Sequence, residues 1–538
     1  MVAIMLSYRC NSSYIDRQLS LHEPKTVWSF EMSTTESKST LDIVPIFSGG
    51  KWIESSTDRT AKVFNPSTGQ PIAKVPLCSA DQTNDVVQSA RDAFDPWNET
   101  PVVERARLMF KLRQLMEARF DEIAALVTRE HGKTLAESRA EVQRAVEMVE
   151  FASGIPSLIV GQTMPNIAKD VDAETVRHPL GVCVGITPYN FPSMVPMWMI
   201  PVALVCGNTF VLKPSEKTPL SANLIGQLLA ESGLPDGVFN IVHGDKECVD
   251  TLLTHPDVAA VSFVGSTPIA KYIYETGTRN GKRVQAAGGA KNHLVIMPDA
   301  DLDITVTALA ASAFGCGGQR CMAGSIAVAI GNIGDRLVDQ LSGHASQLRV
   351  GPSEGNEEVD MGPLIRREHV ERVGGFVDVA SSEGASVALD GRRDFAGEGF
   401  LIGPSVIDQV TSPMKVAQEE IFGPVLSVIR ASDLQSVIDL GLACPFGNGA
   451  SIFTRDGFAA REFKRRFNAG MIGINVGVPA PMPWFPFTGW NQSFFGDLHI
   501  QGTESVQFYT QQKMTLTRWF GSSSDSPQDP VWKTDARR

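Results

Sequence analysis

The sequence has no long apolar run, few cysteines for its length and no excess of positive charge. Nowhere in its 538 residues does an apolar run approach the roughly 18 residues that a membrane-spanning helix needs. The eight cysteines lack the tight spacing and histidine partners of a disulfide framework or a zinc motif, and they favour a reducing compartment. The formal net charge of −12 disfavours nucleic acid and anionic membranes as partners. We therefore expect a soluble protein that acts on small molecules.

Both ends of the chain have the composition of disordered segments. Residues 1–44 are rich in Ser and Thr with little hydrophobic periodicity, and 516–538 are rich in Ser, Pro and Asp. The N-terminal segment carries basic residues, as a mitochondrial import signal does, but Asp16 and Glu23 interrupt them. We expect a cytoplasmic protein, with mitochondrial import as the alternative.

The middle of the chain has the pattern of an α/β protein without internal repeats. Helices are predicted first, around 82–95, 103–130 and 134–153, the last of them amphipathic. Continuous apolar strands then alternate with helices, and the strands are expected at 181–186, 209–212, 238–242, 260–264 and 294–297. Such strands indicate a parallel sheet covered on both faces, which binds ligands, often a nucleotide, at the carboxyl ends of its strands. A second α/β region is expected from about 302 to 480.

The clearest chemistry lies in Phe-Gly-Cys-Gly-Gly-Gln-Arg-Cys-Met-Ala, residues 314–323. The glycines allow a sharp turn after a predicted helix, and Cys321 can then face a cleft. The adjacent Arg320 favours the thiolate, which is the nucleophilic form. The alternative, a small buried apolar cysteine, is about equally supported by this segment alone. Cys316 is expected to lie on the preceding helix and to be dispensable.

Three further segments follow predicted strands. In Pro188-Tyr-Asn-Phe-Pro, the amide of Asn190 is suited to stabilise an oxyanion, although Asn is also common in turns. Lys213 and Glu216 suit the hydroxyls of a ribose, and the acid would repel a 2′-phosphate and so favour NAD over NADP; paired surface charges are the alternative. Ser266, at a predicted helix start, can hold a phosphate or can simply be an N-cap.

These segments, with Glu-Glu-Ile-Phe-Gly-Pro-Val at 419–425, resemble the aldehyde dehydrogenase superfamily in their order and spacing. The resemblance covers about 45–515. The motifs Gly-Gln-Arg-Cys-Met-Ala, Gly-Ala-Lys-Asn-His (289–293), Phe-Thr-Gly (487–489) and Val-Gln-Phe-Tyr-Thr (506–510) resemble its CoA-acylating methylmalonate-semialdehyde dehydrogenase branch.

The resemblance implies a three-part fold. It would consist of a Rossmann-type NAD-binding domain (45–156 and 181–289), an α/β catalytic domain (290–489), and a small sheet (157–180 and 490–515) that forms a homodimer or homotetramer.

The resemblance also implies a role for each site residue. Cys321 would attack the aldehyde while its own peptide N–H and the Asn190 amide hold the oxyanion. NAD would be bound by residues of four segments, namely Lys213 and Glu216 at the adenosine ribose, Ser266 at the pyrophosphate, Glu420 at the nicotinamide ribose, and also Pro188 and Phe422. Arg144 and Arg320 would bind a carboxylate of the substrate, to which guanidinium groups are suited. For Arg144, a place on a solvated helix face is the alternative.

One position departs from the family pattern. Hydrolytic members have a glutamate that activates water where this chain has Ala287, and the acylating branch has asparagine there. A methyl group cannot accept a proton, so we expect CoA rather than water to release the acyl group. Two alternatives stay open: an enzyme that releases a free acid from a specialised-metabolite aldehyde, and an inactive relative with a binding or structural role. The presence of both Cys321 and Asn190 argues against the last.

Overall fold

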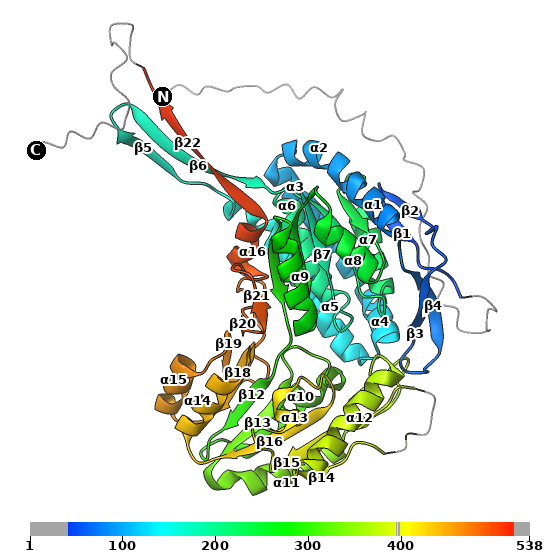
Figure 1. Ribbon diagram of the computed structural model, residues 1–538, viewed down its shortest axis with the longest axis vertical. Helices are drawn as coiled ribbons and strands as arrows, with labels where there is room; N and C mark the ends of the chain where they lie inside the picture. Colours follow the sequence, from blue (N-terminus) through cyan, green and yellow to red (C-terminus); the bar gives the residue numbers. More distant parts are fainter. Residues whose placement is uncertain (1–40, 394, 396–398, 521–538) are drawn as a thin grey trace, which may run out of the picture. The chain divides into compact units, whose positions relative to one another are not determined.

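The computed structural model describes residues 41–393, 395 and 399–520 (Figure 1). Residues 1–40 of the expected N-terminal extension and 521–538 of the expected tail lie outside the described residues. The extension was predicted to reach residue 44, but Val44 is buried and its N–H donates to the carbonyl of Lys74. Among the described helices, none is long and apolar enough to cross a membrane.

The first sheet has eight strands in the order β2-β1-β9-β8-β7-β10-β11-β21. Its five central strands run parallel and are largely buried: β9 (Phe239–Ile241), β8 (Thr209–Lys213), β7 (Val182–Ile186), β10 (Val258–Val264) and β11 (Arg283–Ala287). The outer strands pair antiparallel: β2 (Lys51–Ile53), β1 (Ile46–Ser48) and β21 (Phe494–Phe495). The chain builds outward from β7 in both directions, so the strand order reverses between β7 and β10. A crevice for ligands is expected at this point, outside the carboxyl ends of the strands.

Helices cover both faces of this sheet (Figure 1). One face packs against α1 (Ala80–Asp92), α8 (Lys246–Thr254) and α9 (Thr267–Arg279). The other is covered by α3 (Val102–Ala118), α4 (Phe120–His131), α5 (Leu135–Ser153), α6 (Met194–Val205) and α7 (Leu220–Glu231). The prediction of a single helix over 103–130 is wrong, because this segment forms the two helices α3 and α4. Arg119, with φ −112° and ψ 24°, separates α3 from α4.

A buried carboxylate helps to fix this helical layer. Glu130, near the end of α4, is fully buried, and its two oxygens accept the main-chain N–H groups of Leu220 and Ser221. These N–H groups belong to the first turn of α7 and have no partner within that helix. Burial raises the pKa of Glu130 to about 7.

The second sheet has seven strands in the order β14-β15-β16-β13-β12-β18-β19. They are β14 (Ser386–Leu389), β15 (Ser405–Asp408), β16 (Val425–Ala431), β13 (Gly324–Ile330), β12 (Asn292–Ile296), β18 (Gly449–Phe453) and β19 (Met471–Ile474). The alternation of apolar strands and helices placed the strand at 294–297 in the first sheet, and this is wrong, because β12 pairs with β13 and β18. The resemblance, by contrast, implied a domain boundary at 290, before this strand. An apolar strand buried on both faces carries no local signal for the sheet that it joins.

Alternate residues of β12 pack under different helices. Leu294 and Ile296 join a core with α10 (Leu302–Phe314) and α11 (Gly334–Ser346). Val295 packs on the opposite face with α12 (Arg367–Ser382), α14 (Leu434–Ala443) and α15 (Gly457–Arg466). The second sheet is thus also an α/β sandwich.

A third, three-stranded sheet has the order β22-β6-β5, with β5 (Thr163–Ala168), β6 (Val171–Pro179) and β22 (Thr510–Arg518). The tail was predicted to begin after Thr515, but β22 continues to Arg518, which pairs with Val171. Large apolar side chains of this sheet are exposed: Met164, Ile167, Val176, Met514 and Leu516.

Candidate active site

A cavity of about 310 Å³ lies where the strand order of the first sheet reverses. Residues from both sheets line it, among them Pro188 and Asn190 after β7, Gly265 and Ser266 after β10, Gly288 and Gly289 after β11, and Cys321, Glu420 and Phe422 from the second α/β region. Six of the residues singled out from the sequence thus share one cavity.

The loop before Cys321 is built on tight turns. Cys316, Gly317 and Gly318 all have positive φ. A Cβ on Gly318 would lie 2.2 Å from the carbonyl oxygen of Gly423, so only glycine lets these two loops touch. The prediction that Cys316 lies on the preceding helix is wrong. It lies in the turn after α10, is buried, and lines a second cavity together with Cys321.

Two asparagines of the second sheet hold the main chain at Cys321. The side-chain amides of Asn292 and Asn448 both donate to the carbonyl oxygen of Cys321, at 2.8 and 2.9 Å. Asn292 begins β12 and Asn448 directly precedes β18. Neither residue was predicted from the sequence to have a role, although a buried asparagine beside an apolar strand needs such hydrogen-bond partners.

The thiol of Cys321 is held in its neutral form. Burial and, second to it, the charge of Glu420 raise its pKa to about 12, although the cation of Arg320 opposes both. The expectation that Arg320 favours the thiolate has the right direction, but burial and a like charge outweigh it.

Asn190 is buried, and both its side chain and its main chain make hydrogen bonds. Its side-chain amide donates to the carbonyl of Gln319 at 3.0 Å, which leaves one of its two N–H groups uncommitted. Its main-chain oxygen accepts from Lys133 Nζ at 2.6 Å, and this ammonium also pairs with Glu141 at 2.6 Å. The Lys133–Glu141 pair is fully buried and was missed in the sequence.

Three of the residues expected to bind NAD lie at the carboxyl ends of strands of the first sheet, namely Lys213 and Glu216 at β8 and Ser266 after β10. Ser266 precedes α9, but its hydroxyl does not cap the helix, so hydroxyl and helix N-terminus are both available to a phosphate. Lys213 and Glu216 do not line the cavity. Lys213 Nζ lies 3.8 Å from Glu216 Oε2 at the end of β8, which is the strand beside β7.

The loop that carries Glu420 and Phe422 is fixed by α12. His369 Nε2 lies 2.7 Å from the carbonyl oxygen of Phe422, and Arg372 donates to the carbonyls of Glu420 and Ile421 at 2.9 and 2.6 Å. Phe422 itself has φ +60°, which a bulky residue rarely adopts. No sequence motif connects His369 and Arg372 with this loop, because about 50 residues separate them from it.

A second cavity, of about 460 Å³, also reaches Cys321. Arg144 and Arg320 both line it, so Arg144 does not simply lie on a solvated helix face. Arg144 pairs with Glu147 at 2.6 Å. Arg320 donates to the carbonyls of Ala311 and Ser312, whereas its buried Nε has no hydrogen-bond partner among the described residues. The remaining wall is largely apolar and includes Phe191, Met194, Trp198, Met322, Met482 and Phe487.

Cys321 thus lines both of these cavities. One lies where the strand order of the first sheet reverses, and the other contains Arg144 and Arg320. This arrangement is typical of an enzyme that binds two small molecules side by side. Residues 52–515 match the model of the aldehyde dehydrogenase family, and the chain belongs to this family. It is an NAD-dependent oxidoreductase that acts on aldehydes. The reading as an inactive relative loses its support.

Similar proteins agree on this fold and branch. The chain is 50% identical over 474 residues to malonate-semialdehyde dehydrogenase 1 of Geobacillus thermodenitrificans (strain NG80-2), covering 88% of this chain and 98% of that protein. The crystal structure of methylmalonate-semialdehyde dehydrogenase from Oceanimonas doudoroffii matches with a TM-score of 0.88 and 47% identity, covering 90% of this chain and 99% of that one. A Sinorhizobium meliloti 1021 structure of the same description, complexed with NAD, matches with a TM-score of 0.89 and 43% identity, covering 91% and 100%. The predicted fold class and the family resemblance are confirmed.

Proposed function

We propose that this enzyme oxidises an aldehyde that carries a carboxylate, forms a thioester on Cys321 and transfers the acyl group to CoA. The observation that carries the proposal is the pair Arg144 and Arg320 in the wall of the cavity that reaches Cys321. The names of the similar proteins, malonate- and methylmalonate-semialdehyde dehydrogenases, describe aldehydes with such a carboxylate.

Two arginines in an apolar cavity suit a carboxylate because guanidinium groups bind it through charge-assisted, bidentate hydrogen bonds. The unpartnered Nε of Arg320 is a buried donor that a bound carboxylate can satisfy. In this pose the sulfur of Cys321 forms a bond to the aldehyde carbon, the thiol gives its proton to solvent in the cavity, and the carbonyl oxygen becomes an oxyanion. The free N–H of Asn190 and the peptide N–H of Cys321 stabilise the resulting oxyanion.

The residues around the first cavity are assigned to NAD, which accepts the hydride from the substrate when bound. Lys213 and Glu216 would hold the adenosine ribose, Ser266 the pyrophosphate and Glu420 the nicotinamide ribose, with Pro188 and Phe422 packed beside it. Glu216 disfavours a 2′-phosphate, so NAD should be used in preference to NADP.

CoA is assigned as the acyl acceptor because of Ala287, which ends β11 and is buried. General-base assistance to water is typically worth about 10²–10⁴-fold, and Ala287 supplies none. A thiolate is a stronger nucleophile than water and depends less on such help.

A second candidate is favoured by the size of the substrate cavity. About 460 Å³ lies within the roughly 300–1,000 Å³ typical of sites for drug-sized ligands, which leaves room for more than a three-carbon semialdehyde. An enzyme that converts a larger, specialised-metabolite aldehyde to a free acid would use this room.

The remaining assignments concern domains and assembly. We propose 45–156 and 181–289 as the NAD-binding domain and 290–489 as the catalytic domain. The exposed apolar side chains of β5, β6 and β22 support a role for 157–180 and 490–515 in forming a homodimer or homotetramer.

The test is NADH formation with malonate semialdehyde, methylmalonate semialdehyde, neutral aldehydes of similar size and larger carboxylated aldehydes, each with and without CoA. We expect the semialdehydes to react best, an acyl-CoA product, and a burst of NADH before slow turnover when CoA is absent. Replacing NAD by NADP should lower kcat/KM. Brisk turnover without CoA, with release of a free acid from a larger aldehyde, would favour the second candidate.

A further inference from the structure

The carboxylate of Glu420 lies against the end of β11, near the position where the chain lacks a proton acceptor. Its Oε1 accepts the main-chain N–H of Ala290 at 2.9 Å. A Cβ on Gly289 would lie 2.5 Å from its Oε2, so the absence of a side chain there lets the carboxylate approach. Gly289 is two residues from Ala287. A carboxyl group from the second α/β region therefore reaches this part of the first sheet.

Glu420 also shares its surroundings with the nucleophile. Glu420 and Cys321 line the 310 Å³ cavity together, and they also line a small polar cavity with Lys291. The charge of Glu420 raises the pKa of the Cys321 thiol, second only to burial. Burial likewise raises the pKa of Glu420 above its usual range. Two groups that compete for protons thus lie beside each other.

Two other carboxyl groups line a cavity that reaches Cys321, those of Glu137 and Glu141. Both oxygens of Glu137 accept main-chain N–H groups. Those of Glu141 accept from Lys133 and from main-chain N–H groups. The Oε2 of Glu420 accepts no hydrogen bond from the described residues, so it is the carboxylate oxygen that is available to a reacting proton.

The cations near Glu420 leave this oxygen uncommitted. Lys291 Nζ donates to the main-chain oxygen of Glu419 at 2.7 Å, and burial lowers its pKa to about 8. Arg372 donates to the main-chain oxygen of Glu420 at 2.9 Å. Both favour the ionised carboxylate through their charge without a hydrogen bond to it.

We propose that Glu420 is the proton acceptor and donor of the acyl-release step. Its carboxylate takes the proton of the incoming CoA thiol, or more slowly that of water when CoA is absent, as the new bond to the thioester carbon forms. The tetrahedral intermediate then collapses, the carbon–sulfur bond breaks, and Glu420 returns the proton to the Cys321 thiolate. The resting thiol and carboxylate are both regenerated. The step follows departure of the nucleotide, because the ribose assigned to Glu420 would occupy the same carboxylate.

This inference rests on the proposed function only for the thioester on Cys321, so its test forms that thioester by another route. p-Nitrophenyl acetate transfers an acetyl group to a nucleophilic cysteine without NAD, aldehyde or CoA. Wild-type enzyme should release one equivalent of nitrophenolate in a burst and then turn over steadily. Glu420→Gln should keep the burst and slow the steady state by about 10²-fold. Hydroxylamine, a strong nucleophile that needs little base, should narrow the gap between the two enzymes.

The neighbouring Glu419 provides the matched control. Its side chain is about half exposed, and Glu419→Gln should turn over like wild type. The pH dependence of deacetylation should be lost only in Glu420→Gln. Should that variant fail to fold, Glu420→Asp retains the carboxyl group on a shorter side chain and should deacetylate more slowly than wild type with a normal burst.

The outcomes separate the two proposals. No burst in the wild type would reject Cys321 as the nucleophile and with it the proposed function. A wild-type burst with equal steady-state rates in wild type and Glu420→Gln would overturn the role of Glu420 alone. Loss of the burst in a folded Glu420→Gln would also overturn it, because Glu420 would then act in acylation.

Discussion

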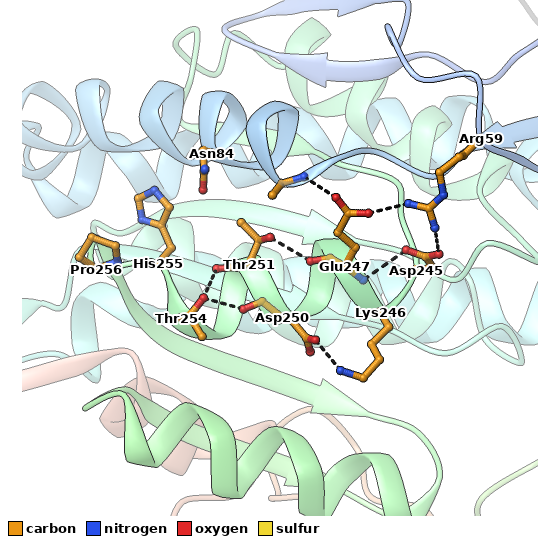
Figure 2. A pocket seen from close by; sticks show the side chains of 11 residues that line it. Arg59, Asn84, Asp245, Lys246, Glu247, Asp250, Thr251, Thr254, His255 and Pro256 are labelled. Atoms are coloured by element: carbon orange, nitrogen blue, oxygen red, sulfur yellow. Dashed lines mark hydrogen bonds and ion pairs between the residues drawn. The ribbon is translucent and has the colours of Figure 1, made fainter.

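A groove of about 1,000 Å³ beside α1 and α8 is larger than either cavity that reaches Cys321. Figure 2 shows its charged side chains paired with one another. Arg59 contacts both Asp245 and Glu247, and Lys246 contacts Asp250. All of these side chains are at least partly exposed to solvent.

The cavities at Cys321 show the opposite arrangement. Several of their ionisable groups lie in the interior, and burial shifts the pKa values of Cys321, Glu420 and Lys291. Arg320 retains a buried donor without a partner in the part of the chain that the structure describes. The comparison teaches that volume and charge do not identify the site in this molecule. The site is identified instead by buried ionisable groups whose pKa values are shifted or whose hydrogen bonds are incomplete, as is usual for functional sites.

The largest effect that distinguishes the cavities at Cys321 from the groove is expected from replacing Cys321 itself. Cys321→Ser should reduce NADH formation by roughly 10³-fold or more, because an unactivated hydroxyl is a poor nucleophile. NAD binding, followed by titration calorimetry, should be nearly unchanged. Cys78→Ser is the control, since Cys78 is buried but lines neither cavity, and it should retain activity. Substantial turnover by Cys321→Ser would reject the assignment.

The second test compares the pH dependence of stability that a buried and an exposed carboxylate contribute, each of which accepts at least one N–H group at the start of a helix. Glu130 accepts N–H groups of α7 in the interior, whereas Glu247 accepts the N–H of Ala80 at the start of α1 beside the groove. Burial raises the pKa of Glu130 from 4.5 to about 7, so the folded protein binds more protons than the unfolded chain between these values.

The stability that Glu130 contributes is therefore fully present below pH 4.5 and is lost as the pH rises to about 7. At 1.36 kcal/mol per pKa unit this amounts to about 3 kcal/mol. Glu130→Gln should remove that pH dependence. The urea unfolding midpoints of wild type and variant are compared at pH 5 and at pH 7.5, and the difference between the two proteins should change between these pH values. Glu247→Gln should not. A pH dependence unchanged in Glu130→Gln would show that its carboxyl group titrates normally.

Arg144 and Arg139 separate the cavity from the surface within one helix. Their side chains in α5 are 41% and 42% exposed, but only Arg144 lines the cavity. Loss of a charged hydrogen-bonding partner costs about 1.5–3 kcal/mol, or tenfold or more in specificity. Arg144→Leu should raise KM for a carboxylated aldehyde by that factor and leave a neutral aldehyde of similar size little affected. Arg139→Leu should change neither, and equal effects of Arg144→Leu on both substrates would remove it from the substrate site.

The sequence could predict the parts of the site that are local. Each segment that carries Asn190, Ser266 or Cys321 follows a strand or a glycine turn, so its position at a ligand-binding edge can be read from its neighbours. Glu420 follows the short helix α13 (Lys415–Gln418) instead, and only the family resemblance gave it a role. The central strands of the first sheet are continuous apolar runs and were predicted for the same reason, except β11, whose Gln285 and small alanines weaken the pattern.

What the sequence could not predict depends on contacts between distant segments. Asn292, Asn448, His369 and Arg372 act on loops about 30 to 130 residues away, and no spacing rule connects them. The pKa of Cys321 also depends on how deeply both sheets bury it, whereas the sequence shows only the adjacent Arg320. Burial and distant charges are properties of the completed fold.

The smallest effect is expected at the groove itself. Arg59 pairs with Asp245 and Glu247, but its side chain is 49% exposed, and ion pairs that exposed are weakened by water and salt. Arg59→Ala should therefore lower the unfolding free energy by less than about 1 kcal/mol and leave kcat/KM unchanged. Urea unfolding at low and high salt, together with NADH formation, measures both quantities. The small loss should shrink further at high salt, because the pairs are already screened there. A tenfold fall in kcat/KM would instead make the groove part of the functional surface, and burial would no longer distinguish the two regions.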